Sequence, residues 1–272
     1  MKPSMNKPIQ VVEETGMPKR LSVPDTARFQ LSTFGYLYLQ NKGWFNGIPL
    51  DDNGYFPWFT YPAVDFLRGI ITKDTKVFEY GSGYGTLFLK NTVAEYASVE
   101  HSPEWAEKLK TIDAKLNVSV VKENDKVIPW AQELIDEFFN ELAWDLPFSG
   151  DRGHDLTHGL LNKEFAGYAS DIATKPKNYY DIIIVDGMAR ALTGYIASKY
   201  IKDSGIIILD NSDRWHYNHL QRYLIDSGFG RIDFWGPGAG RQDGWCTSFF
   251  SKGFKINNVN PERPVDSNII FT

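Results

Sequence analysis

From about Val77 onward, short apolar runs alternate along the chain with longer amphipathic stretches. Two of the runs, DIIIVD at 181–186 and GIIILD at 205–210, are continuously apolar, which is typical of strands buried on both faces of a parallel sheet. The pattern predicts strands at 76–80, 97–100, 118–121, 180–185 and 205–209. It predicts helices at 87–95, 103–112, 129–142, 189–200 and 215–226. We therefore expect an α/β protein with a doubly wound, mostly parallel sheet, whose ligand crevice lies at the carboxyl ends of the strands.

The two ends of the chain and one internal stretch depart from this alternation. Residues 1–70 begin as a proline-punctuated arm and continue with helical and turn signals, so we expect them to pack on the sheet as a cap. Residues 71–255 would form the main domain, with an irregular insertion rich in Gly, Asp and His near 144–178, and 256–272 a C-terminal tail. The last two apolar runs, 231–235 and 246–251, are joined by a glycine-rich loop and predict an antiparallel end to the sheet.

Composition narrows the classes of partner. A net charge of −5 argues against nucleic acid as the main partner, because nucleic-acid binders usually present a basic face. The single cysteine, Cys246, excludes an intramolecular disulfide and favours a cytoplasmic setting. No segment has the apolar length of a membrane span, and the N-terminus lacks the apolar core of a secretory signal. We expect a cytoplasmic protein that acts on a small molecule; the sequence does not indicate its oligomeric state.

The segment VFEYGSGYGT, residues 77–86, places glycines at three alternate positions directly after the first predicted strand. Glycine in such a turn serves either a positive φ or the close approach of a ligand. A triphosphate-binding loop would need a lysine that is absent here, and a dinucleotide fingerprint that begins at Gly81 would need a third glycine where the chain has Thr86. The spacing is instead G-x-G-x-G.

Acidic residues accompany these glycines. Glu79 precedes them, and Glu100 ends the second predicted strand, nineteen residues after Gly81. A carboxylate in that position can accept hydrogen bonds from both hydroxyls of a ribose. The alternative is that the glycines serve only a tight turn and that Glu100 caps the helix that begins at Ser102-Pro103.

With these motifs, residues 75–252 resemble the class I S-adenosylmethionine-dependent methyltransferases, and the runs PWFTYP (57–62), EYGSG, VDG and LDNSD resemble a bacterial subgroup of them. The resemblance implies a Rossmann-like sheet with an antiparallel C-terminal strand. It implies that S-adenosylmethionine lies on the glycine turn, with Glu100 at its ribose and the chain after the third strand beside its adenine. The residues implied to bind the cofactor are Glu79, Gly81, Ser82, Gly83, Gly85, Glu100 and His101.

Polar side chains also follow the fourth and fifth predicted strands, in DGMAR (186–190) and DNSD (210–213). A methyltransferase must align a nucleophile with the methyl group and remove its proton. Asp186 and Asp210 are candidates for this catalytic role, and His216 is a candidate base. The fourth-strand motif lacks the Pro-Pro-aromatic clamp of enzymes that methylate nucleic-acid amino groups. We therefore expect methylation of a small or sugar-containing acceptor at oxygen.

A metal is one alternative at these strand ends. Asp186, Asp210 and Asn211 are similar to the magnesium site of catechol-type O-methyltransferases, in which Mg²⁺ would fix and acidify a substrate hydroxyl. Those enzymes carry a lysine base soon after the first aspartate, whereas this chain has Arg190. The other alternative is that Asn211, Ser212 or Asp213 caps the helix predicted at 215–226.

Aromatic residues near both ends of the main domain are further candidates. Trp58, Thr60 and Tyr61 either line the acceptor site or pack the N-terminal region on the sheet, and Trp245 is expected in the substrate-side wall. Two other functions remain open: a nicotinamide-dependent oxidoreductase, and a non-catalytic domain that binds a cofactor or a partner.

Overall fold

The computed structural model describes residues 50–51, 54–142, 163–214, 217–238 and 241–255. Most of the predicted arm, the candidate base His216 and the predicted tail lie outside the described residues. In the predicted cap, two short strands pair in antiparallel fashion and precede a ten-residue helix: β1 (Leu50–Asp51), β2 (Gly54–Tyr55) and α2 (Tyr61–Ile70).

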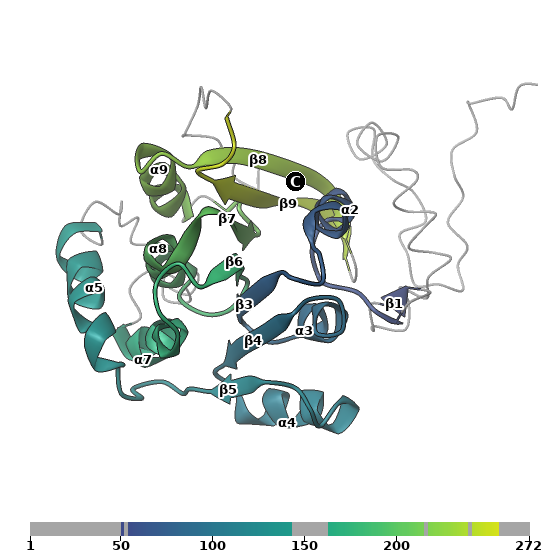
Figure 1. Cartoon of the computed structure of the whole chain (residues 1–272), viewed down its shortest axis with the longest axis horizontal. Helices are drawn as coiled ribbons and strands as arrows, with labels where there is room; N and C mark the ends of the chain where they lie inside the picture. The colour runs from purple at the N-terminus through teal and green to yellow at the C-terminus, as the bar shows by residue number, and fades with distance from the viewer. Residues whose placement is uncertain (1–49, 52–53, 143–162, 215–216, 239–240, 256–272) are drawn as a thin grey trace, which may run out of the picture.

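Within the described residues, seven strands form the main sheet, in the spatial order β5-β4-β3-β6-β7-β9-β8 (Figure 1). Their bounds are β3 (Lys76–Tyr80), β4 (Glu95–Glu100), β5 (Val118–Val120), β6 (Tyr180–Val185), β7 (Ile201–Asp210), β8 (Gly230–Gly238) and β9 (Arg241–Ser251). The five strands from β3 to β7 pair in parallel, whereas β9 pairs antiparallel with both β7 and β8. This confirms the predicted fold class: a doubly wound, mostly parallel sheet with an antiparallel C-terminal strand.

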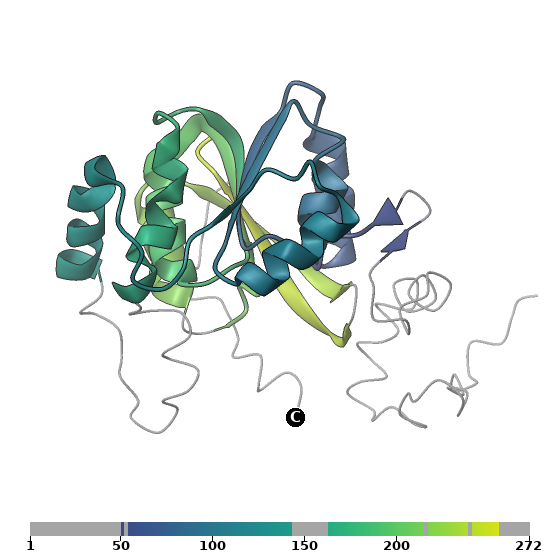
Figure 2. The same cartoon turned by 90° about the horizontal axis from the view of Figure 1, so that it is seen from below.

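Helices cover both faces of this sheet (Figure 2). One face carries α2, α3 (Tyr84–Leu89) and α4 (Pro103–Ile112). The other carries α5 (Gln132–Glu137), α7 (Ala166–Ser170), α8 (Arg190–Tyr200) and α9 (Asn218–Asp226). Shorter 3₁₀ and π turns flank α5 and α7: η3 (Pro129–Ala131), η4 (Phe138–Leu142), η6 (Lys163–Phe165) and η7 (Asp171–Thr174).

The apolar runs of β6 and β7 feed both hydrophobic cores. Ile182 and Ile184 point into the core under α2, while Ile183 and Val185 point into the core under α8 and α9. All four side chains are at most 3% exposed. Successive side chains of a strand alternate between faces, so only a continuous apolar run can fill two cores at once.

Several predicted boundaries were wrong. The first helix begins at Tyr84, within the glycine pattern, because Thr86 Oγ1 accepts a hydrogen bond from the Gly83 amide at 2.8 Å and fixes the turn. It ends at Leu89, and β4 begins at Glu95, paired with Lys76. The last helix begins at Asn218 rather than at residue 215, after a turn in which the Arg214 amide donates to Asn211 O at 3.1 Å.

The predicted insertion is also less irregular than expected. Residues 143–162 lie outside the described residues, but residues 163–174 form helical turns. Phe165, Tyr168 and Ile172 are buried in the core there, at the three- to four-residue spacing of a helical face. That spacing was present in the sequence, but the small and polar residues around it obscured the period.

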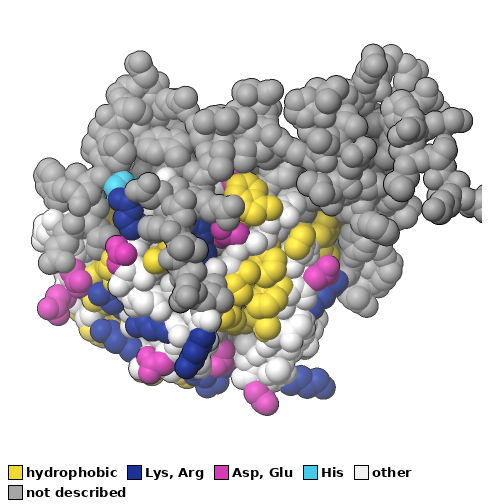
Figure 3. Space-filling model, turned by 90° about the horizontal axis from the view of Figure 1, so that it is seen from above, with side chains coloured by type: hydrophobic (Ala, Val, Ile, Leu, Met, Phe, Trp, Pro, Cys, Tyr) yellow, Lys and Arg dark blue, Asp and Glu magenta, His cyan; other side chains and the backbone are white. Residues whose placement is uncertain are grey.

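Figure 3 looks onto the side of the molecule on which β8 lies in Figure 1. Hydrophobic side chains gather in one patch on this face, with acidic and basic side chains interspersed around it. Trp235 of β8 is 40% exposed, so this edge strand is not uniformly polar. In the described part of the chain, no helix has both the length and the apolar character needed to cross a membrane.

Candidate active site at the strand ends

A cavity of about 630 Å³ lies at the carboxyl ends of β3, β4, β6 and β7, where the sequence predicts the ligand crevice. All the residues expected to hold the cofactor line it: Glu79, Gly81, Ser82, Gly83, Gly85, Glu100 and His101. Asp186, Asp210 and Asn211 line it as well. The fold thus brings both predicted groups to one cavity, and their roles toward a ligand stay predictions.

The three alternating glycines meet three different demands. Gly81 has φ +91°, and a Cβ placed on it would lie 2.6 Å from Gly187 Cα, so only glycine fits there. A Cβ on Gly85 would lie 2.9 Å from Glu79 Oε1. A Cβ on Gly83, by contrast, meets no described protein atom within 4 Å. The fold itself requires Gly81 and restricts Gly85, whereas Gly83 leaves room at the cavity wall.

Glu79 lies behind the glycine turn and is 2% exposed. Its Oε2 accepts hydrogen bonds from Thr86 Oγ1, at 2.6 Å, and from the Tyr96 hydroxyl. Burial raises the pKa of Glu79 to about 8, against the lowering effect of these two hydrogen bonds. Glu79 therefore holds the first turn of α3 through its hydrogen bond with Thr86, and it also lines the cavity.

Glu100 ends β4 with one carboxylate oxygen bound and the other open. Its Oε1 accepts from the Ser102 amide at 2.9 Å and from His101 Nδ1 at 2.8 Å. None of the described residues donates to its Oε2. The helix cap is Ser102, whose Oγ accepts from the Trp105 amide at 3.2 Å, so the alternative that Glu100 caps α4 was wrong. The hydrogen bond that His101 donates to Glu100 raises the pKa of His101.

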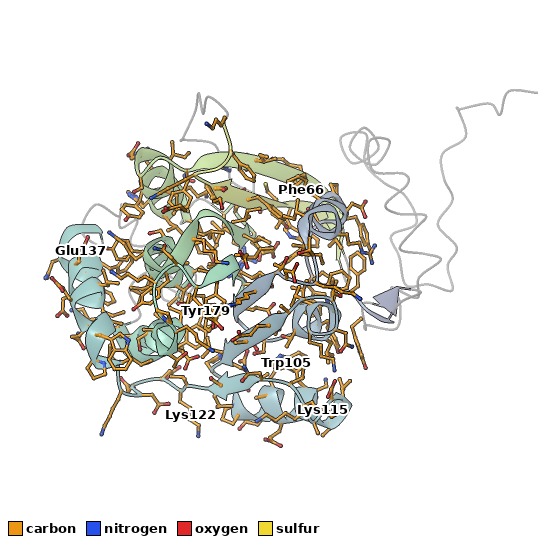
Figure 4. All side chains as sticks on the ribbon, in the orientation of Figure 1. Phe66, Trp105, Lys115, Lys122, Glu137 and Tyr179 are labelled. Atoms are coloured by element: carbon orange, nitrogen blue, oxygen red, sulfur yellow. The ribbon has the colours of Figure 1, made fainter. Side chains whose placement is uncertain are left out.

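Trp105 closes the cavity beyond Glu100. It reaches from α4 toward α3 (Figure 4), where its ring meets the ring of Tyr84 edge-on with centroids 6.0 Å apart. Its Nε1 donates to Ser82 O at 2.7 Å, which ties α4 to the glycine turn. The resemblance implied that the chain after β5 flanks the adenine, but none of the described residues there lines the cavity. Ser102 and Trp105, which follow β4, line the cavity with Glu100.

Arg190 joins the ends of β6 and β7. Its Nε donates to Gly187 O at 3.1 Å, and one terminal nitrogen donates to Asp210 O at 2.7 Å and to Asn211 Oδ1 at 3.1 Å. The other terminal nitrogen donates to Asp186 O at 3.0 Å and forms an ion pair with Asp186 Oδ1 at 2.8 Å. A guanidinium has five N–H donors, so every donor of Arg190 is used.

This arrangement fits poorly with the predicted magnesium site. Arg190 already binds the Asp186 carboxylate and the Asn211 amide oxygen, two of the three proposed ligands. The third, Asp210, accepts at Oδ1 from Trp245 Nε1 at 2.9 Å and from Thr247 Oγ1 at 2.6 Å. No group of three or more His, Cys, Asp or Glu side chains suited to a metal ion occurs among the described residues. The Arg190 guanidinium supplies the positive charge at this place, so these side chains do not fit a magnesium ion.

Burial also changes the acidity of the two aspartates. It raises the pKa of Asp210 to about 7, with a further contribution from the charge of Asp186 and opposition from Arg190. Burial likewise raises the pKa of Asp186, opposed by the charges of Arg190 and Arg214. Asp210 is 3% exposed, yet only one of its carboxylate oxygens has a described partner. A carboxylate with a pKa near neutrality is suited to accept a proton.

The remaining polar residues of the DNSD motif join β7 to β9. The Ser212 amide donates to Cys246 O at 3.0 Å, and Asp213 Oδ1 accepts from the Cys246 amide at 3.1 Å. The helix α9 begins without a side-chain cap. These residues therefore do not cap α9 as described from Asn218, and the helix start predicted at residue 215 lies outside the described residues.

The aromatic candidates divide into wall and packing residues. Trp58 lines the cavity and is 51% exposed, and Trp245 lines it while only 3% exposed. Thr60 is fully buried, its amide donating to Thr247 Oγ1 at 3.2 Å, and Tyr61 packs its ring against Phe56 with centroids 5.2 Å apart. Thr60 and Tyr61 therefore pack the N-terminal region on the sheet, whereas the role of Trp58 and Trp245 toward an acceptor stays a prediction.

Sequence reasoning missed Trp105 and Arg214 among the residues that line the cavity. Arg214 follows the DNSD motif directly, and its position at a strand end was a usable signal. Trp105 lies on α4, three residues after its cap, where only the fold brings it back to the glycine turn.

The strand order and the position of the cavity together define a class I methyltransferase-like Rossmann fold. No protein-family model matches the sequence, and no curated protein matches it.

Solved structures do match. A methyltransferase-like protein from Silicibacter pomeroyi DSS-3 is 17% identical over 75% of this chain and 89% of its own, with a TM-score of 0.42. A putative caffeoyl-CoA O-methyltransferase from Staphylococcus aureus is 13% identical over 85% of this chain and 100% of its own, with a TM-score of 0.40. Spermidine synthase from Thermotoga maritima is 14% identical over 70% of this chain and 55% of its own, with a TM-score of 0.37.

Proposed function

We propose that the protein transfers a methyl group from S-adenosylmethionine to an oxygen of a small acceptor molecule. The observation that carries the proposal is the single cavity that joins the glycine turn and Glu100 to Asp186 and Asp210. One end offers the open Oε2 of Glu100 and the free space over Gly83. The other end offers two acidic side chains beside which a nucleophile can be held.

The charges at the glycine end favour a sulfonium cofactor over a nicotinamide dinucleotide. Glu100 lines the cavity there, and its Oε2 has no donor among the described residues. S-adenosylmethionine carries a sulfonium and an ammonium against one carboxylate, so it brings a net positive charge to the Glu100 carboxylate. A dinucleotide would instead bring a negatively charged pyrophosphate beside that carboxylate.

At the acceptor end, Asp210 is the best-placed proton acceptor. Bound S-adenosylmethionine supplies an electrophilic methyl group, so the protein has to position a hydroxyl and take its proton. The hydroxyl proton passes to the Asp210 carboxylate, whose pKa of about 7 matches this task. Arg190 holds Asp186 and the ends of β6 and β7 at fixed separation. The candidate base His216 lies outside the described residues, and it stays a second proposal.

The proposal is tested by calorimetric titration with S-adenosylhomocysteine and, in parallel, with NAD, each with and without Mg²⁺. We expect saturable binding of S-adenosylhomocysteine alone, weakened at least tenfold in Glu100→Ala and Glu100→Gln. Glu107→Gln is the matched control, because the Glu107 side chain on α4 is 74% exposed and lies outside the cavity wall.

The other results would point to the other functions. Saturable binding of NAD without S-adenosylhomocysteine would favour an oxidoreductase. Binding of neither by folded protein would favour an interaction domain. Binding of S-adenosylhomocysteine with equal affinity in the Glu100 variants would remove Glu100 from the site.

A further inference from the structure

We infer that the acceptor carries an oxyanion, a carboxylate or a phosphate, and that Arg214 binds it. This inference rests on the proposed methyl transfer and names the substrate class of the same cavity. Arg214 lines the cavity beside Asn211, just beyond the end of β7, and is half-buried. Its backbone is held in the turn after β7, where the Tyr217 amide donates to Arg214 O at 3.1 Å.

The two arginines of the cavity differ in what their guanidinium groups bind. Arg190 is saturated by Asp186, Gly187, Asp210 and Asn211. None of the described residues accepts a hydrogen bond from the Arg214 guanidinium or pairs with it as an ion. A half-buried guanidinium has lost part of its water, and its planar fork of donors matches a carboxylate or phosphate.

The charge distribution separates this end of the cavity from the cofactor end. Glu100 lies at the glycine turn, where its carboxylate suits a cationic cofactor. Arg214 lies between the end of β7 and the start of α9. It lines the cavity, and its guanidinium donors have no partner among the described residues. An acceptor with an anionic group would be drawn to Arg214 and kept from the Glu100 carboxylate, which leaves its hydroxyl free to lie near Asp210.

The test compares charged and neutral probes of one shape on protein saturated with S-adenosylhomocysteine. The probes are 4-hydroxybenzoate, 4-hydroxyphenyl phosphate and the neutral 4-hydroxybenzamide, chosen as aromatic because Trp58 and Trp245 line the cavity. Binding is followed by calorimetry and by quenching of tryptophan fluorescence. The variants are Arg214→Gln, Arg214→Lys and, as a charge-matched control, Lys177→Gln, since Lys177 is exposed before β6 at the opposite edge of the sheet.

We expect at least one anionic probe to bind wild-type protein tenfold or more tightly than the amide. The preference should vanish in Arg214→Gln, persist in part in Arg214→Lys and stay unchanged in Lys177→Gln. A wild-type protein without preference for either anion, or a preference that survives in Arg214→Gln, would overturn the inference. Which of the two anions binds distinguishes a carboxylate from a phosphate.

Titration with S-adenosylhomocysteine precedes the probes in every variant. If wild-type protein does not bind S-adenosylhomocysteine, both the proposed function and this inference are overturned. Intact binding together with absent charge selection would overturn the inference alone. Intact binding in Arg214→Gln also shows that the variant is folded around its cofactor site.

Discussion

Gly81 and Gly187 lie backbone against backbone where β3 and β6 end. A Cβ on Gly81 would lie 2.6 Å from Gly187 Cα, and a Cβ on Gly187 would lie 2.7 Å from the Gly81 nitrogen. The turn that carries the first glycine of the pattern is therefore shaped by the neighbouring strand. Gly83, two residues on, faces no such neighbour, so the glycines of one motif should respond differently to the same substitution.

Gly81→Ala should lower the free energy of unfolding by about 2–4 kcal/mol. The alanine would have to adopt a positive φ, and its Cβ would clash with the backbone of Gly187. Gly83→Ala should lose less than about 1 kcal/mol of stability but bind S-adenosylhomocysteine at least tenfold more weakly, since its methyl group enters the ligand space. Gly69→Ala on α2 is the control; its Cβ meets nothing within 4 Å and it lies outside the cavity wall. Urea denaturation and calorimetry measure the two effects. Normal affinity in Gly83→Ala would place the ligand elsewhere.

Arg190→Gln should lower the free energy of unfolding by about 3 kcal/mol or more. The change leaves the Asp186 carboxylate without its ion pair and removes the hydrogen bonds that join the ends of β6 and β7. Arg190→Lys should recover little of this stability, since an ammonium lacks the planar set of N–H donors with which a guanidinium binds both strand ends. Lys199→Gln on the same helix is the control. Its ion pair with Glu137 has side chains 29% and 34% exposed, so the loss should stay below about 1 kcal/mol. Equal losses in thermal or urea unfolding would show that the contacts of Arg190 stabilise the fold no more than an exposed ion pair does.

The sequence predicted the sheet well because its strongest signals are local. Continuous apolar runs such as those of β6 and β7 can only be buried strands in this setting, and the glycines and acids that end the strands meet at one edge by topology alone. The residues predicted to bind the cofactor therefore line one cavity.

Partner choice at the strand ends was not predictable in the same way. Whether Asp186 faces a metal or a guanidinium depends on how Arg190 turns back from α8, and whether Asp213 caps a helix or binds Cys246 depends on where β9 returns. These are contacts between segments far apart in sequence, and residue type and spacing leave them open.

Asp210 should titrate near pH 7, and Trp245 offers a means to observe it, because its Nε1 donates to Asp210 Oδ1 at 2.9 Å. A tryptophan fluorescence transition near pH 7 should be present in wild-type protein and absent from both Asp210→Asn and Trp245→Phe. Thr247→Val removes a hydrogen bond that favours the charged form, so the transition should move to higher pH. A transition that persists in Asp210→Asn would belong to another group.

The burial of Glu79 should make folding less favourable as the pH rises. An unfolded chain releases the Glu79 proton near its ordinary pKa of 4.5, whereas the folded protein retains it up to about 8. Between these values the folded state binds more protons than the unfolded state, so the Glu79 contribution to the free energy of unfolding falls with rising pH and is constant above about 8.

Glu79→Gln stays neutral in both states and should remove that dependence. Measured by urea denaturation, the free energy of unfolding of Glu79→Gln minus that of the wild type should increase by at least about 1 kcal/mol between pH 5.5 and 7.5. The same difference for Glu107→Gln, a change at an exposed position on α4, should remain constant. A constant difference for Glu79→Gln as well would mean that Glu79 is already ionised in the folded protein, held by Thr86 and Tyr96 against the cost of burial.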